Sequence, residues 1–213
     1  MNSDPLDDLC LMIRSRYGAL LIDTAEEDRA EALVSRAAAT MGLTLLVWRR
    51  ASGIHCPGAS SGVYGTQDPR AALTHIMASD MPALYLFHGL APDLRNVEVA
   101  DLLREAARRV PARQEAIVLT GADLVLPESL RGVVGLVHIP VPSRREYEAL
   151  LERVVADLST RMKVTVALTP QDHDRLMANL SGLMLSEAGR LLTRAIVEDG
   201  VLDKSDVIAV VEA

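Results

Sequence analysis

One glycine-rich stretch has the spacing of a phosphate-binding loop. Gly53 and Gly58 are separated by four residues, and Ser60 follows two positions later. In a working Gly-x4-Gly-Lys-Ser/Thr loop, the glycines let backbone N–H groups surround the phosphates, the lysine neutralises them and the hydroxyl holds magnesium. Here Ala59 replaces the lysine, and Pro57 lacks an N–H donor. Spacing alone therefore makes Gly53, Gly58 and Ser60 candidates for nucleotide binding, and the plain alternative is a flexible surface loop.

The other reactive side chains do not form a recognised set. His55 and Cys56 are adjacent, but Cys10 is distant in the sequence, so a metal site lacks ligands. The Gly-x-Ser-x-Gly turn of serine hydrolases is absent, whereas a Ser/His/Asp set assembled from distant segments stays open. We therefore predict no metal centre and assign no catalytic residue.

Composition narrows the class of protein. The chain has 213 residues, of which 49% are hydrophobic and 24% charged, as in globular domains. Its net charge of −7 argues against nucleic-acid binding, which needs a basic face. No apolar run approaches the ~20 residues of a membrane span, and residues 1–5 do not resemble a signal peptide. Two cysteines are too few for a disulfide scaffold. We expect a reduced, cytoplasmic protein with neither a nucleic acid nor a membrane as partner.

Short apolar runs alternate with helical patterns over the first two thirds of the chain. Such runs are typical of strands buried on both faces of a parallel sheet. The predicted strands are 19–23, 43–48, 83–87, 116–119 and 135–139. The predicted helices begin near residues 5, 24, 69 and 97. The glycine- and serine-rich stretch 49–67 is predicted as a long loop. Thr24 is the predicted cap of the second helix. This order predicts an α/β fold, a three-layer sandwich with a five-stranded parallel sheet, over residues 1–142.

The strand pattern stops after Pro140 and Pro142. Ser143 is predicted to cap a long helix, and further helices are predicted to begin near 169, 186 and 203. Residues 143–213 are therefore predicted to form a small helical subdomain, which follows the α/β core.

Several segments together resemble one family. Residues 138–147 contain a strand end, two prolines, a cap and a charged helix, and resemble the point where the sheet of an AAA protein ends and its helical lid begins. Residues 180–188 resemble the glycine-containing lid turn. The stretches 13–17, 24–29, 47–48, 68–69 and 195–203 are similar to the N-terminal half of the AAA proteins named after hypothetical chloroplast reading frame forty-six. This resemblance covers nearly the whole chain and implies a P-loop NTPase fold with a C-terminal lid and degenerate nucleotide motifs, followed by a catalytic module.

The resemblance locates the phosphate loop after the first strand, at residues 24–28. Thr24 stands there with Glu26, Glu27 and Asp28, instead of glycines and a lysine. Carboxylates repel a triphosphate, so hydrolysis at this position is not expected. Thr24 nevertheless remains a candidate for contact with a nucleotide.

Two further positions of the family pattern are altered, and a third is kept. The third strand ends in His88 instead of the acidic pair that holds magnesium, and the next strand is followed by Thr120. Arg131 lies roughly where AAA proteins present an arginine to the nucleotide of a neighbouring subunit. The plain alternatives are a packing histidine and a solvated arginine at a helix end.

These observations favour a non-catalytic AAA-like module that serves assembly or regulation of an AAA ATPase. Its expected partner is a catalytic AAA module or a neighbouring subunit, and homo-oligomerisation is left open. One alternative is a nucleotide-binding or slowly hydrolysing domain with a non-standard phosphate site, for which ATP with magnesium would be the cofactor. Another is an interaction adaptor that is independent of nucleotides. By itself the chain is not expected to be an enzyme.

Overall fold

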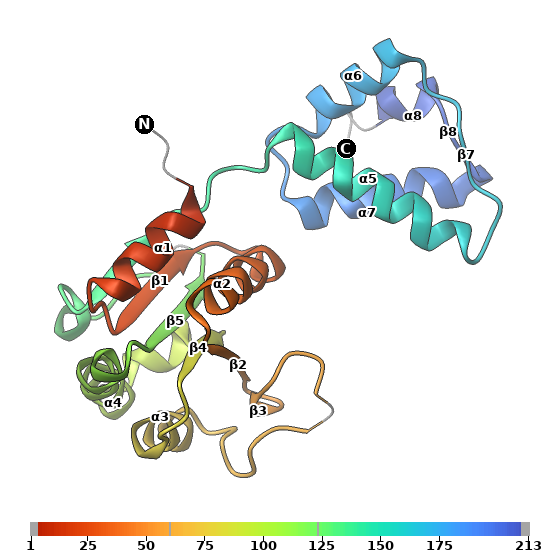
Figure 1. Ribbon diagram of the computed structural model, residues 1–213. Coiled ribbons are helices and arrows are strands. Elements are labelled where there is room, and N and C mark those ends of the chain that lie inside the picture. Colours follow the sequence, from red (N-terminus) through yellow and green to blue (C-terminus); the bar gives the residue numbers. More distant parts are fainter. Residues whose placement is uncertain (1–3, 60, 123, 210–213) are drawn as a thin grey trace. The chain divides into compact units, whose positions relative to one another are not determined.

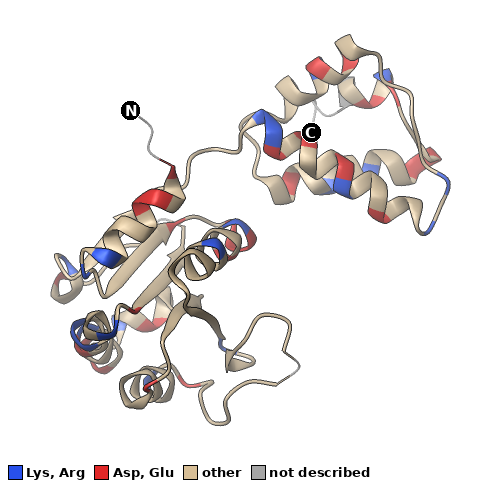
Figure 2. Ribbon diagram, in the orientation of Figure 1, with Lys and Arg blue, Asp and Glu red and all other residues tan. Residues whose placement is uncertain are grey.

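The computed structural model describes residues 4–59, 61–122 and 124–209. It divides into two compact units, Met1–Ile139 and Pro140–Ala213, which are described separately. Basic and acidic side chains are interspersed along the helices of both units (Figure 2). Within the described residues, no helix combines the length and apolar character needed to cross a membrane.

The first unit is built on a six-stranded sheet. Its strands are β1 (Ala19–Asp23), β2 (Thr44–Arg49), β3 (Gly53–His55), β4 (Ala83–His88), β5 (Ala116–Gly121) and β6 (Val134–Val137). They lie in the order β3-β2-β4-β5-β1-β6, and every neighbouring pair is parallel except β2 with β3. Parallel neighbours require crossover connections, which the helices supply.

Helices cover both faces of this sheet (Figure 1). They are α1 (Pro5–Arg14), α2 (Glu27–Met41), α3 (Pro69–Ala78) and α4 (Val97–Arg109), with short 3-10 turns η1 (Ala91–Arg95), η2 (Val110–Arg113) and η3 (Glu128–Leu130). The buried side chains of α1 and α2 share one apolar core with the sheet, and those of α3 and α4 share another. Two cores separated by a sheet make the three-layer α/β sandwich that the sequence predicts.

The sheet differs from the prediction at one edge. The five predicted parallel strands are present, but β3 adds a sixth, antiparallel strand inside the stretch predicted as a long loop. Trp48 and Thr66 hold it in place. The indole N–H of Trp48 donates to the carbonyl of Thr66 at 2.7 Å, and the Thr66 hydroxyl accepts the backbone N–H of Ile54 at 2.9 Å. A buried side chain outside the strand therefore fixes a strand too short for its own pattern to reveal.

In the described part of the second unit, up to residue 209, four helices surround an apolar core of their own. They are α5 (Arg144–Ser159), α6 (Pro170–Leu180), α7 (Leu185–Asp199) and α8 (Lys204–Ala209). Ser143 and Glu146 form a capping box at the start of α5, which explains why the helix begins directly after the prolines.

Two short strands correct the prediction that strands stop after Pro142. β7 (Thr165–Val166) and β8 (Val201–Leu202) pair in parallel. The N–H of Thr165 donates to the carbonyl of Gly200 and that of Ala167 to the carbonyl of Leu202, both at 2.9 Å. Two residues are too few to show a strand period, so the sequence does not reveal this pair.

Candidate functional site

The glycine-rich stretch lacks the surroundings of a phosphate loop. Gly53 lies in β3 with φ of +69°, and a Cβ there would lie 2.5 Å from the Thr66 hydroxyl oxygen, so strand packing accounts for this glycine. Gly58, with φ of +77°, lies in the exposed loop that follows. Ser60 lies outside the described residues. The next helix, α3, begins only at Pro69, so the structure does not bring these residues to a helix N-terminus.

Thr24 lies between β1 and α2, but it is not the helix cap that the sequence predicts. The N-cap residue is Glu26, and the helix begins at Glu27. The Thr24 hydroxyl instead accepts the backbone N–H of Glu26 at 3.0 Å, in a turn before the helix. The Thr24 N–H donates to the carbonyl of Gly121 at 3.2 Å, which ties the end of β1 to the end of β5.

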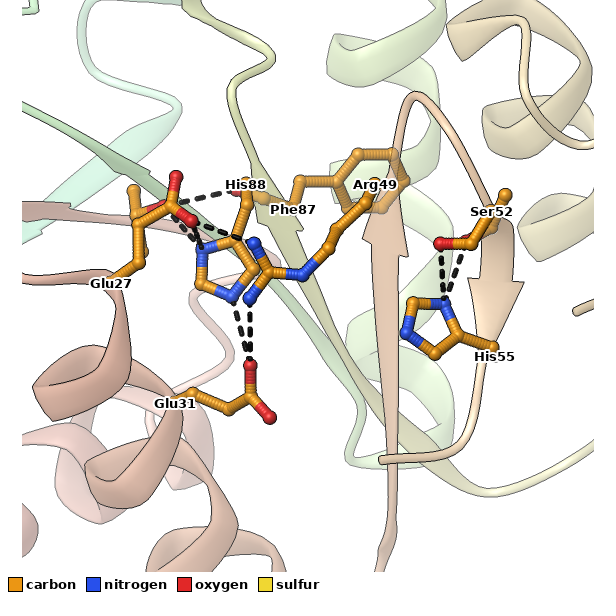
Figure 3. A network of polar contacts seen from close by, with 9 residues as sticks. Glu27, Glu31, Arg49, Ser52, His55, Phe87 and His88 are labelled. Atoms are coloured by element: carbon orange, nitrogen blue, oxygen red, sulfur yellow. Dashed lines mark hydrogen bonds and ion pairs between the residues drawn. The ribbon is translucent and has the colours of Figure 1, made fainter. Parts of the chain in front are cut away.

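A network of polar side chains lies beside this turn, at the carboxyl edge of the sheet (Figure 3). Arg49 is the last residue of β2, and His88 is the last residue of β4. Glu27 and Glu31 lie one turn apart at the start of α2, so both face the same side of the helix. The carboxyl edge is where open α/β sheets bind their ligands, and this network is therefore the candidate functional site.

Arg49 bridges the two glutamates. Its Nη1 lies 2.7 Å from Oε2 of Glu27, and its Nη2 lies 3.1 Å from Oε2 of Glu31. Partial burial disfavours the charged guanidinium, but the hydrogen bonds to Glu27 and Glu31 outweigh it and raise the pKa of Arg49 above its usual value. The guanidinium is thereby held between two carboxylates of its own chain.

His88 completes the network. Its Nδ1 lies 2.9 Å from the Thr120 hydroxyl, and its Nε2 lies 3.3 Å from Oε2 of Glu31. The Thr120 hydroxyl also donates to the carbonyl of Phe87 at 3.4 Å, and Oε2 of Glu27 lies 3.7 Å from Nδ1, so both ring nitrogens face oxygen atoms. Burial lowers the pKa of His88 below its usual value, although the carboxylates of Glu27 and Glu31 oppose this effect.

The network carries more negative than positive charge. With His88 neutral, two carboxylates and one guanidinium sum to a formal charge of −1. Glu27 and Glu31 keep 40% and 28% of their side-chain surface exposed, so the surplus charge faces the edge where a ligand would approach. Such an edge attracts cations and repels phosphate groups. No cluster of three or more metal-binding side chains occurs among the residues that the structure describes.

The structure brings some sequence candidates together and leaves others apart. Thr24 and His88 lie at the same carboxyl edge, together with Thr120. Arg131 lies elsewhere, exposed at the C-cap of η3. Sequence reasoning misses Arg49 and Glu31 as site residues. Two features of the sequence could have pointed to them: Arg49 directly follows a buried apolar run, and Glu31 lies four residues after Glu27.

Comparison with known proteins identifies the family. Residues 5–139 match the family model of the SpoVK-like AAA ATPase N-terminal domain, and residues 145–213 match the model of the second domain. The AAA domain-containing protein ycf46 of Trieres chinensis is 24% identical over 204 residues, which are 94% of this chain and 40% of that protein. The ycf46 protein of Guillardia theta is 26% identical over 192 residues, which are 89% of this chain and 37% of that protein. The chain thus spans about two fifths of the length of these curated relatives.

Solved structures show the same fold at lower identity. The FIGL-1 AAA domain in complex with ADP has a TM-score of 0.59 and 12% identity, covering 92% of this chain and 71% of that one. A single-residue variant of RuvB from Thermotoga maritima has a TM-score of 0.58 and 14% identity, covering 97% of this chain and 66% of that one. Together with the family models, these similarities confirm the resemblance inferred from the sequence motifs. The chain belongs to the SpoVK-like AAA ATPase family and has its N-terminal and second domains.

Proposed function

We propose that this chain is a non-catalytic AAA module that serves the assembly or regulation of an AAA ATPase. One observation carries the proposal: Arg49, Glu27, Glu31 and His88 satisfy one another at the sheet edge where a nucleotide phosphate would have to bind. The partner is a catalytic AAA module or a neighbouring subunit.

The residues at this edge do not fit a magnesium nucleotide. The connection between β1 and α2 holds Thr24, Glu26 and Glu27 where glycines and a lysine would cradle phosphates. The cationic side chain of the network, Arg49, is already paired twice. A triphosphate would have to displace Glu27 and Glu31 and then lie against their charge, which is electrostatically unfavourable.

A titration with a fluorescent ATP analogue, with and without magnesium, tests the proposal. We expect no saturable binding at millimolar analogue and no rise in melting temperature, because a ligand that binds the native state stabilises it by mass action. The Glu27→Gln/Glu31→Gln double variant is the matched control, since it removes the repulsive carboxylates and leaves the fold and Arg49 in place. Micromolar, magnesium-dependent binding by the wild-type chain would support the alternative, a nucleotide-binding domain with a non-standard phosphate site.

The assembly role needs a separate measurement. We expect the chain to co-sediment with a catalytic AAA module or with further copies of itself in analytical ultracentrifugation. A strict monomer that also fails to bind a catalytic module would contradict the proposed role, and would leave the interaction adaptor that is independent of nucleotides.

A further inference from the structure

Three unpartnered oxygens lie near the opposite, amino edge of the sheet. Within the described part of the chain, the buried side-chain atoms that lack a hydrogen-bond partner are the Tyr85 hydroxyl and both carboxyl oxygens of Glu115. Tyr85 is 1% exposed and Glu115 is 0% exposed. Buried polar groups are nearly always hydrogen-bonded, and a buried carboxylate without partners is strongly disfavoured. Glu115 is therefore a buried carboxyl group that the candidate site does not use.

Strand register explains why these groups are neighbours. Leu84 pairs with Ala116 and Tyr85 with Ile117, so Glu115 lies beside Ala83, at the start of β4. Side chains alternate between the faces of a sheet, which places Glu115 and Tyr85 on the same face. That face is covered by apolar side chains of α3 and α4.

One cationic side chain, Arg113, lies close to Glu115, and its ion pair with Asp80 is weak. The charged and titratable groups that face Glu115 are Arg113 from η2, Asp80 from the segment after α3, and Tyr85 from β4. Arg113 Nη2 lies 3.5 Å from Oδ1 of Asp80, whose side chain is 97% exposed. An exposed ion pair at this distance contributes little to stability, so Arg113 can change partner at small cost.

The protonation of Glu115 is sensitive to pH in the neutral range. Burial raises its pKa to about 7, while the charge of Arg113 and the nearby N–H of Ala83 oppose the rise and the charge of Asp80 adds to it. At lower pH the carboxyl is neutral and tolerates its apolar surroundings. At higher pH it is ionised and needs a cation.

We propose that Glu115 and Arg113 form a proton-operated switch at the amino edge of the sheet. While Glu115 is protonated, Arg113 pairs with Asp80. When Glu115 releases its proton to solvent, Arg113 leaves Asp80 and pairs with the buried carboxylate. The exchange leaves Asp80 without its cation and gives one to the buried Glu115 carboxylate. It is independent of the proposed AAA role.

The carbon-13 resonance of the Glu115 carboxyl, followed by NMR from pH 5 to 9, tests this switch directly. We expect a titration with a midpoint near neutral pH. Arg113→Gln should move the midpoint to higher pH, because it removes the cation that favours the carboxylate. Asp80→Asn should move it to lower pH, because it removes a repelling charge. Both side chains are partly or fully exposed, so neither substitution is expected to prevent folding.

The Nε–H resonance of Arg113 supplies the structural readout. Its chemical shift should change between pH 6 and 8 in wild type, with the same midpoint as the Glu115 carboxyl, and should stay constant in Glu115→Gln. Glu105→Gln is the matched control, because Glu105 lies on α4 in an exposed pair with Arg109. A Glu115 carboxyl that titrates below pH 5, or equal shifts of the midpoint in Arg113→Gln and Asp80→Asn, would overturn the proposal. The wild-type titration decides it even if Glu115→Gln does not fold.

Discussion

Arg49 Nη1 lies 2.7 Å from Oε2 of Glu27, so the last residue of β2 is joined to the first residue of α2. The two residues are 22 positions apart in the sequence. The contact closes the β1–α2–β2 unit at its carboxyl end, directly beside the turn that holds Thr24.

Replacing Arg49 with glutamine should lower the free energy of unfolding by about 1 kcal/mol, the upper range for partly exposed ion pairs. It removes both hydrogen bonds and leaves Glu27 and Glu31, one helical turn apart, to repel each other. Urea denaturation followed by the fluorescence of Trp48, the single tryptophan and the neighbour of Arg49, measures the change. Arg104→Gln, which breaks an exposed pair with Asp101 on α4, is the control. An equal loss in both variants would show that the network adds nothing beyond an ordinary surface pair.

His88 should make stability depend on pH on the acid side of neutrality. Its pKa is lowered in the native state, whereas the unfolded chain has the ordinary value of about 6.5. The unfolded state therefore binds a proton first as the pH falls, and the contribution of His88 is fully present above about pH 6.5 and is lost progressively below it. The melting temperature of His88→Gln, measured from pH 7.5 to 5, should fall less than that of wild type. A steeper fall in the variant would mean that the carboxylates raise the pKa of His88 instead.

Gly18 should tolerate no side chain. A Cβ at this position would lie 1.8 Å from the backbone oxygen of Ala107 and 2.8 Å from Pro111. Because backbone atoms cannot yield as a flexible side chain does, Gly18→Ala should cost about 3 kcal/mol or more. Gly189→Ala is the contrasting variant, since its Cβ would meet Leu150 at an ordinary 3.5 Å inside α7. It should be neutral or stabilise that helix by up to about 1 kcal/mol. Calorimetry of both variants checks the ordering, which a stable Gly18→Ala chain would contradict.

Substitution of Arg131 tests whether this arginine acts on a neighbouring subunit or is only a solvated surface residue. If the chain presents this arginine to the nucleotide of a neighbouring catalytic module, Arg131→Ala should reduce the ATPase rate of that module at least tenfold while leaving the melting temperature of the chain unchanged. Arginine fingers elsewhere contribute far more than this threshold, about 10³-fold or greater. Arg108→Ala, an exposed position on α4, controls for the loss of a surface charge. Equal ATPase rates with both variants would leave Arg131 as a surface residue.

The sequence predicts the layers of this fold because buried strands and covering helices have different patterns of apolar residues. Leu20, Leu84 and Val118 lie in continuous apolar runs, which are typical of strands covered on both faces, and all three are fully buried. The same pattern does not predict β3, because three residues are too few to show the alternation of a strand. In addition, Thr66, whose hydroxyl fixes the strand, lies 12 residues after Ile54. The prediction of Thr24 as the helix cap is wrong because its hydroxyl bonds the backbone two residues on, in a turn that a cap resembles in sequence.

The candidate site is harder to predict than the fold. Glu27 and His88 stand out in the sequence because they occupy positions where a family pattern has other residues. Arg49 does not, because its importance comes from strand order: β2 lies next to β4, so residues 49 and 88 end at the same edge. The spacing of residues in the sequence does not show that β2 and β4 are neighbours in the sheet.

The ion-pair network also constrains how this chain can evolve. Glu27→Lys would supply a phosphate-binding cation, but it would set that cation against Arg49, with which position 27 is now paired. Arg49→Ser would remove that conflict, but on its own it leaves two glutamates facing each other. Each single step toward a nucleotide pocket therefore crosses a less stable intermediate. The ion pairs among Glu27, Glu31 and Arg49 thus make these positions epistatic, because substitutions that would favour phosphate binding together each destabilise the chain alone.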